Sequence, residues 1–342
     1  MSATEQMNGD GRREVVVVTG ASGGVGRATA HAFAKRGARI GLVARGEKGL
    51  HDAEREVHEL GGEALVVPTD VAQAGEVEAA AEAVEARFGP IDTWVNDAMA
   101  TVFARFVDTS PEEFKRATEV TYLGTVYGTM AALGRMTARD RGTIIQVGSA
   151  LSYRSIPLQA AYCGAKFGIR GFTDSIRSEL LHDRSNVHIT MVQLPGVNTT
   201  QFNWCRSKLA RHPQPVPPIY QPEIAAEAVY WSAHHRRREL RVGYSAVEAI
   251  LGSKIAPGLA DRYLARTAFS GQQVNDIPVA ADRPNNLFAP VEELAATHGI
   301  FDDRARRRSP QLWANTHRAL LAGAAVGAAA AGTAGVLAAR SR

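Results

Sequence analysis

Short apolar runs alternate between residues 13 and 245 with segments in which apolar positions recur every three or four residues. Continuous apolar runs are typical of strands that are buried on both faces of a parallel sheet, and the periodic segments are typical of helices. The pattern predicts strands at 14–19, 39–44, 63–67, 91–95, 143–147, 187–194 and 239–242. It predicts helices at 27–36, 47–60, 72–88, 111–136, 158–181 and 222–233. This alternation predicts an α/β fold with a doubly wound, mostly parallel sheet of about seven strands and helices on both faces.

The pattern weakens after residue 245. Residues 246–318 contain an amphipathic stretch at 259–265, a polar segment with prolines at 276–290 and a basic run at 304–308. We interpret them as an extension that lies on the core domain and is loosely ordered in part. At the other end, residues 1–12 are polar and are expected to be disordered, and they lack the apolar run of a signal peptide.

The last residues, 319–342, form an Ala/Gly-rich apolar tail in which the stretch 319–339 holds no charge. As a helix this stretch would be roughly 30 Å long, which is enough to cross the apolar layer of a bilayer. Alanine and glycine are only weakly lipophilic, so a helix that packs on the protein or frays is the alternative. The sequence leaves both interpretations open: membrane contact through 319–339, and no membrane contact.

Composition excludes several classes of function. The net charge of +4 over 342 residues is small, which argues against nucleic acid as a partner. The two cysteines, Cys163 and Cys205, cannot build a disulfide framework, and neither lies in a pattern with zinc-site spacing. We therefore predict no metal site and a cytoplasmic location, with membrane association only through the tail.

A glycine-rich turn, Thr19-Gly-Ala-Ser-Gly-Gly-Val-Gly26, lies between the first strand and the first helix. Glycines there let the backbone turn tightly and approach a pyrophosphate, while the helix N-terminus supplies unpaired N–H groups and the positive end of a dipole. The candidate cofactor-binding residues of this turn are Gly20, Ser22, Gly24, Val25 and Gly26. The spacing is GxxxGxG, which differs from the GxGxxG of the commonest dinucleotide fingerprint.

With this turn the chain resembles the short-chain dehydrogenase/reductase family, and the resemblance extends from about residue 13 to residue 245. It implies a Rossmann-type fold and an NAD(P)-dependent oxidoreductase that interconverts a carbonyl and an alcohol. We also expect a homodimer or a homotetramer.

The motif Tyr162-Cys-Gly-Ala-Lys166 lies in the helix after the fifth strand. Residues four apart share one helix face, so the phenol and the ammonium are expected to point into one cleft. The ammonium and an oxidised nicotinamide are expected to stabilise the phenolate and to lower the tyrosine pKa from about 10. The resemblance implies that Tyr162 is the acid/base, that Lys166 also binds the nicotinamide ribose, and that Ser149 hydrogen-bonds the substrate oxygen.

Arg45 stands at the end of the second strand with no acid beside it. A cation there suits a ribose 2′-phosphate, so we predict NADP as the cofactor, with NAD as the alternative. The resemblance implies that Asp70 contacts the adenine and that Asn96 belongs to the cofactor site. Met99 replaces a glycine that is usual in the family, which alters the packing against the adenosine ribose.

The segment from Pro195 to Thr199 resembles the one that lines the nicotinamide in the family, with Thr199 placed to bind the carboxamide. The spacing from the proline to the threonine is one residue shorter than the common form, so Thr200 is a second candidate. Thr121 stands where the family has a catalytic asparagine that helps to hold a water in a proton relay. A threonine hydroxyl is shorter, and we expect an altered relay.

The segment after Thr200 carries prolines together with Phe202, Trp204, Ile219 and Tyr220. As a lid over the substrate it predicts a small apolar carbonyl compound or alcohol, and a connector packed on the sheet is the alternative. A second class of function also stays open: a sensor or scaffold of the same fold that binds the cofactor with little or no turnover. The departures at Met99 and Thr121 are its support.

Overall fold

The structure is a computed structural model, and it describes residues 11–280 and 282–323. The expected disorder of 1–12 and the tail of 319–342 fall largely outside these residues. Within the described residues, no helix is long and apolar enough to cross a membrane.

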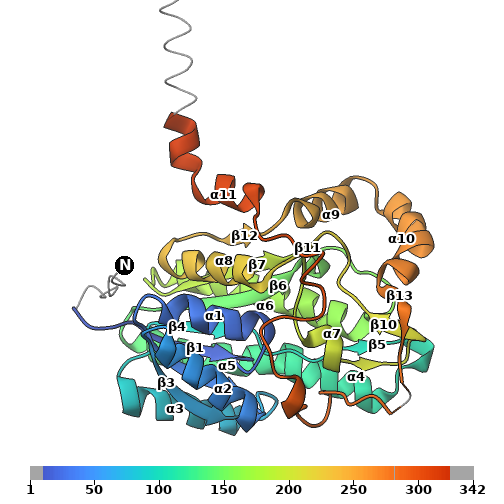
Figure 1. The fold of residues 1–342 in the computed structure, drawn as a ribbon. Helices are drawn as coiled ribbons and strands as arrows, with labels where there is room; N and C mark the ends of the chain where they lie inside the picture. The colour runs from blue at the N-terminus through green and yellow to red at the C-terminus, as the bar shows by residue number, and fades with distance from the viewer. Residues whose placement is uncertain (1–10, 281, 324–342) are drawn as a thin grey trace, which may run out of the picture.

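Seven parallel strands form the central sheet in the order β12-β7-β6-β4-β1-β2-β3 (Figure 1). Their bounds are β1 Val15–Thr19, β2 Arg39–Ala44, β3 Glu63–Pro68, β4 Thr93–Asn96, β6 Thr143–Ser149, β7 His188–Leu194 and β12 Glu239–Arg241. The predicted α/β fold with its doubly wound sheet is confirmed. The strand order reverses between β1 and β4, and crevices that bind ligands lie at such points, at the carboxyl ends of the strands.

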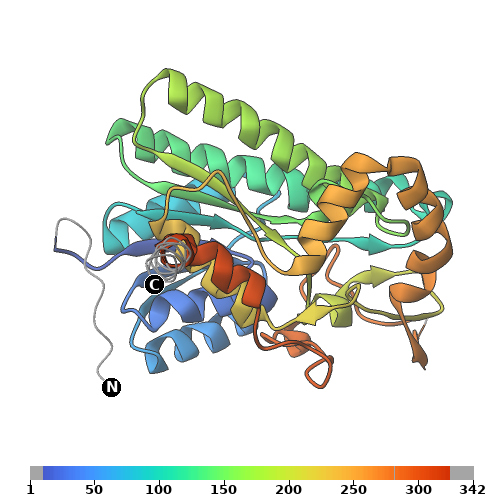
Figure 2. The same ribbon diagram turned by 90° about the horizontal axis from the view of Figure 1, so that it is seen from above.

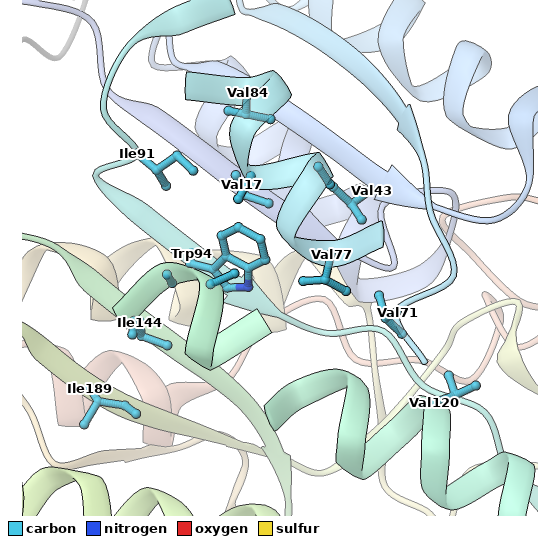
Figure 3. Packing of buried hydrophobic residues seen from close by; sticks show 14 of the residues in the cluster. Val17, Val43, Val71, Val77, Val84, Ile91, Trp94, Val120, Ile144 and Ile189 are labelled. Atoms are coloured by element: carbon cyan, nitrogen blue, oxygen red, sulfur yellow. The ribbon is translucent and has the colours of Figure 1, made fainter. Parts of the chain in front are cut away.

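Helices cover both faces of the sheet (Figure 2). One face carries α3 Ala74–Phe88, α4 Pro111–Thr118, α5 Gly124–Ala138 and α6 Ala160–His182, and the other carries α1 Gly24–Ala34, α2 Glu47–Glu59 and α8 Pro222–His234. Trp94 of β4 lies at the centre of the first face, fully buried among Val17, Val77 and Ile144 (Figure 3). The apolar runs of the strands therefore fill a core on each side of the sheet.

The helix predicted at 111–136 is two helices, α4 and α5, joined by a π-helical turn at Glu119–Leu123. Thr121 lies in this turn with no exposed surface, and its hydroxyl bonds the backbone of Ala100. A π turn adds one residue to the helical repeat. The apolar periodicity continues across it, which is why the sequence predicted a single helix.

The remaining elements are short or belong to the extension. The short ones are β5 Val102–Phe103, β8 Gly196–Val197, α7 Gln201–Trp204, β9 Arg206–Ser207, β10 Arg211–Pro213 and β11 Ile219–Tyr220, and the extension contains α9 Tyr244–Ile255, α10 Pro257–Gly271, β13 Gln273–Pro278, η4 Glu292–Leu294 and α11 Pro310–Thr316. β13 pairs antiparallel with β10. From there residues 283–302, called the strap below, return to the glycine turn, far from them in the sequence (Figure 1).

Candidate active site

A cleft with a volume of about 150 Å³ opens at the carboxyl ends of β1 to β4. Its lining comes from the glycine turn, from the ends of β2, β3 and β4, from the loop after β8 and from the strap. The lining side chains and glycines include Gly20, Ser22, Gly24, Val25, Arg45, Asp70, Asp97, Met99, Thr199, Thr200, Trp204, Asn286 and Glu292. The position at the reversal of the strand order and the shape of the glycine turn both fit a dinucleotide.

The glycine turn has no room for side chains at two positions. Gly20 has a φ of +76°, and a Cβ there would lie 3.0 Å from the backbone of Ala98. At Gly26 a Cβ would lie 2.3 Å from the carbonyl oxygen of Gly20. The close approach of the backbone that a pyrophosphate needs is therefore built into this turn.

Ser149, Tyr162 and Lys166 lie together, as predicted from the motif. The Ser149 side chain lies near enough to the Tyr162 phenol to lower its pKa. Lys166 is buried, and its Nζ lies 5.5 Å from the centre of the Tyr162 ring and donates to the carbonyl of Val147 at 2.6 Å. The end of β6 supplies Ser149 and one face of α6 supplies the other two, so rigid elements hold all three.

The pKa of Tyr162 in the protein alone is higher than that of a free tyrosine. Burial is the largest cause of this increase. The Ser149 side chain lowers the pKa, and the charges of Cys163 and Asp97 raise it further. The expected lowering of this pKa requires an oxidised nicotinamide beside the phenol, and it stays a prediction. The neutral phenol is thus the favoured form, which suits a proton donor.

Asp97 is the functional candidate that the sequence interpretation missed. Its carboxylate lines the cleft beside Gly26, and the hydroxyl of Thr19 accepts the backbone N–H of Asp97 at 3.0 Å. Burial raises the pKa of Asp97 to about 7, against the charge of Lys166. Burial also lowers the pKa of Lys166 to about 8, against the charge of Asp97. This carboxylate electrostatically couples the glycine turn to Lys166.

A visible signal for Asp97 exists in the sequence. The run Asn96-Asp97-Ala98-Met99 departs at Asp97 and at Met99 from the Asn-Asn-Ala-Gly that is usual in the family. An acid in place of an amide changes no helix or strand pattern, but it adds a charge beside a lysine that the fold buries.

Thr121 differs from the expected member of a proton relay. Its hydroxyl donates to the carbonyl of Ala100 at 2.8 Å and accepts the N–H of the same residue at 3.0 Å. Both directions of its hydrogen bonding are used within the protein. The residue thus ties the π turn to the loop after β4, and this interaction positions the backbone beside Asp97 and Met99.

Arg45 and Asp70 line the cleft, but each is already engaged within the protein. The Arg45 guanidinium donates to the carbonyls of Asn286 and, at 3.4 Å, Leu287. Burial lowers the pKa of Arg45, and the charge of Arg116 adds to this effect. The Asp70 carboxylate accepts from Arg116 at 2.5 Å and from the N–H of Ala72 at 3.1 Å. Their roles toward a 2′-phosphate and an adenine stay predictions.

Several sequence candidates are absent from the cleft lining: Gly26, Asn96, Thr121, Ser149, Tyr162, Lys166 and Pro195. Asn96 is 2% exposed, and its amide bonds Trp94, Thr129 and Gln146 inside the first face of the sheet. The side chain joins β4, β6 and α5, and the place of Asn96 in the cofactor site stays a prediction. Pro195 likewise does not line the cleft, whereas Thr199 and Thr200 both do. The Thr200 hydroxyl donates to the strap carbonyl of Leu294 at 2.5 Å, which leaves Thr199 as the better candidate for a carboxamide.

The segment considered as a lid divides into two parts. Ile219 and Tyr220 are 3% exposed in β11, which pairs parallel with β8, and this supports the connector interpretation for them. Trp204 lines the cleft, and Phe202 packs against Phe103 and against Phe301 of the strap. Only the part around α7 borders the cleft.

Comparison with known proteins agrees with this geometry. Residues 14–209 match the family described as short chain dehydrogenase. The chain is 34% identical over 284 residues to the uncharacterized oxidoreductase YxnA of Bacillus subtilis, covering 82% of this chain and 77% of that protein.

Two solved structures are similar to the chain. One is an alcohol dehydrogenase from the archaeon Thermococcus sibiricus complexed with 5-hydroxy-NADP, at 28% identity and a TM-score of 0.58. The other is a metagenomic short-chain oxidoreductase in complex with NADP, at 29% identity and a TM-score of 0.56. They cover 67% of this chain, and 95% and 96% of their own chains, respectively. The chain therefore belongs to the short-chain dehydrogenase/reductase family and is an oxidoreductase of that family.

Proposed function

We propose that this protein is an NADP(H)-dependent oxidoreductase that interconverts a carbonyl and an alcohol on a small apolar molecule. The observation that carries the proposal is the grouping of Ser149, Tyr162 and buried Lys166 at the end of β6 and on α6, near a cleft that fits a dinucleotide. The solved relatives with NADP or its 5-hydroxy form support the choice of cofactor. When bound, the nicotinamide supplies the hydride donor or acceptor.

The residues divide the remaining work. Ser149 positions the carbonyl oxygen by a hydrogen bond, and Tyr162 donates the proton that this oxygen needs on reduction. Lys166 holds a positive charge one helical turn from the phenol, and its ammonium would also bind the ribose hydroxyls of the cofactor. Ser149 and Lys166 are buried and Tyr162 is half-buried, which limits water around them and strengthens their interactions.

Apolar side chains support the proposed class of substrate. Trp204 of α7 lines the cleft, and Phe202 of the same helix packs against Phe103 and Phe301. A lining of this kind favours an apolar ketone or alcohol over a charged metabolite. A panel of aliphatic and aromatic ketones, followed by NADPH absorbance, identifies the class.

The decisive variant is Tyr162→Phe, which removes the transferable proton and keeps the ring. We expect kcat to fall by about 100-fold or more, with little change in the Kd for NADPH. Tyr244→Phe is the matched control, because Tyr244 is 67% exposed at the start of α9. Wild-type activity in Tyr162→Phe would refute the mechanism. NADPH binding by the wild type without consumption of any ketone would favour a sensor or scaffold.

Two proposals concern assembly. We propose a homodimer or homotetramer, which native mass measurement tests. Membrane contact through 319–339 is tested by truncation after residue 318: the full chain is expected to sediment with membranes and the shortened chain is not. A full chain that stays in the supernatant without detergent would contradict that contact.

A further inference from the structure

The strap closes the outer side of the cofactor cleft and is fastened at both ends. Near its start, the Arg283 Nε donates to the carbonyl of Asn203 at 3.0 Å, and the N–H of Asn286 donates to the carbonyl of Trp204 at 2.7 Å. At its end, Asn198 accepts the N–H of Phe301 at 3.1 Å and donates to the Asp302 carboxylate at 2.9 Å. The residues between these anchors lie over the cleft.

The middle of the strap contacts the phosphate-binding turn directly. The carbonyl of Ala296 accepts the N–H of Gly24 at 2.9 Å, and the carbonyl of Ala295 accepts from Arg27 at 3.2 Å. Arg27 is 4% exposed and is also held by Glu56 through two hydrogen bonds. Hydrogen bonds from the glycine turn and from buried Arg27 therefore hold the strap against the turn.

Glu292 places a carboxylate at the N-terminus of α2, inside the cleft lining. Its Oε2 accepts the N–H of Gly49 at 3.3 Å and would lie 2.9 Å from a Cβ on Gly46, the N-cap of α2. Arg45 precedes Gly46 directly. In dinucleotide sites of this topology, the group near the end of the second strand reads the ribose 2′ substituent, with an acid for a hydroxyl and a cation for a phosphate.

A cation, Arg45 of the core domain, and an acid, Glu292 of the strap, both line this cleft. We propose that Glu292 is a specificity-determining residue of the cofactor site, supplied by the extension, and that it disfavours the 2′-phosphate of NADP relative to the 2′-hydroxyl of NAD. Its carboxylate accepts from a hydroxyl and repels a phosphate, whereas Arg45 does the reverse. The inference rests on the proposed function. It means that the preference for NADP is weaker than Arg45 alone would predict.

The test is a pair of dissociation constants, for NADPH and for NADH, measured by titration of the full chain without substrate. Glu292→Gln keeps the size of the side chain and removes its charge. We expect the ratio Kd(NADH)/Kd(NADPH) to rise by about fivefold, the scale of one half-exposed charge interaction. Glu293→Gln is the matched control, because its side chain is exposed next to the cleft and is not part of its lining.

The outcomes separate the inference from the function beneath it. An unchanged ratio in Glu292→Gln, with wild-type affinity for NADPH, overturns the inference alone. Wild-type protein that binds neither cofactor overturns the proposed function and the inference with it. Glu292→Lys serves as the second variant: its ratio is expected to exceed that of Glu292→Gln, and a ratio at or below the wild-type value contradicts the role of Glu292. Thermal unfolding of each variant verifies that it is folded.

Discussion

The glycine turn and the strap contact the same cleft, but they arise from the sequence in different ways. The turn is eight consecutive residues, and steric contacts within it require glycine. A Cβ on Gly26, for example, would lie 2.3 Å from the carbonyl oxygen of Gly20. The strap reaches the turn from the far end of the chain through hydrogen bonds to backbone carbonyls, such as that from Gly24 to Ala296. A steric requirement for glycine is visible in the sequence. A contact through a backbone carbonyl is not, because every residue type has this group.

The largest effect is expected where sterics are tightest. Gly26→Ala should lower the free energy of unfolding by about 1–3 kcal/mol, because the added methyl collides with backbone that cannot move aside cheaply. The Kd for NADPH should rise at least about tenfold as the turn opens. Chemical denaturation and cofactor titration measure the two quantities.

Gly134→Ala is the control for this substitution, because Gly134 is exposed in α5 with open space around a Cβ. It should raise the free energy of unfolding by up to about 1 kcal/mol, since alanine is the better helix former. Equal behaviour of the two variants would show that the turn tolerates a side chain and would contradict its role.

How far the sequence could predict the molecule follows from the same contrast. The strands, the helices and the Tyr162–Lys166 pair depend on local spacing, and the structure confirms the fold. Asn96 was assigned to the cofactor, but its amide faces Trp94 and Gln146, because the direction of a side chain at a strand end depends on neighbouring strands. The partners of Arg45 come from the strap, and no local pattern connects such distant segments.

A smaller effect is expected from loosening the strap. A Cβ on Gly299 would lie 2.5 Å from the carbonyl oxygen of Thr199, so Gly299→Ala should push the strap away from the cleft. We expect the Kd for NADPH to rise by about three- to tenfold, with a faster cofactor dissociation rate and a nearly unchanged unfolding midpoint. Stopped-flow displacement of NADPH measures the rate.

The matched variant in the extension is Gly258→Ala. Gly258 is exposed at the start of α10, with nothing within 4 Å of a Cβ. It should bind NADPH as the wild type does. If Gly299→Ala also binds like the wild type, the strap does not contribute to holding the cofactor.

The smallest effect concerns Asp97, which connects the turn to Lys166. Because burial raises the pKa of Asp97 to about 7, the folded protein retains a proton that the unfolded chain releases near pH 4, and stability is lost as the pH rises between these values. Asp97→Asn lacks this loss. Its stability relative to wild type should therefore increase as the pH rises from 5 to 7.5, the range in which the wild type loses the contribution of this proton.

Unfolding curves at several pH values measure this difference. Asp183→Asn, at an exposed position at the end of α6, should show no such trend. A difference between Asp97→Asn and wild type that is constant with pH would mean that the carboxylate is solvated in the folded protein.

The glycine turn and the strap together form one cofactor site. Hydrogen–deuterium exchange of the full chain, with and without saturating NADPH, tests it most directly, because it reports on the backbone amides of both regions at once. We expect NADPH binding to slow the exchange of backbone amides in residues 20–27 and also in residues 286–302. Protection confined to residues 20–27, with unchanged or faster exchange in the strap, would contradict it.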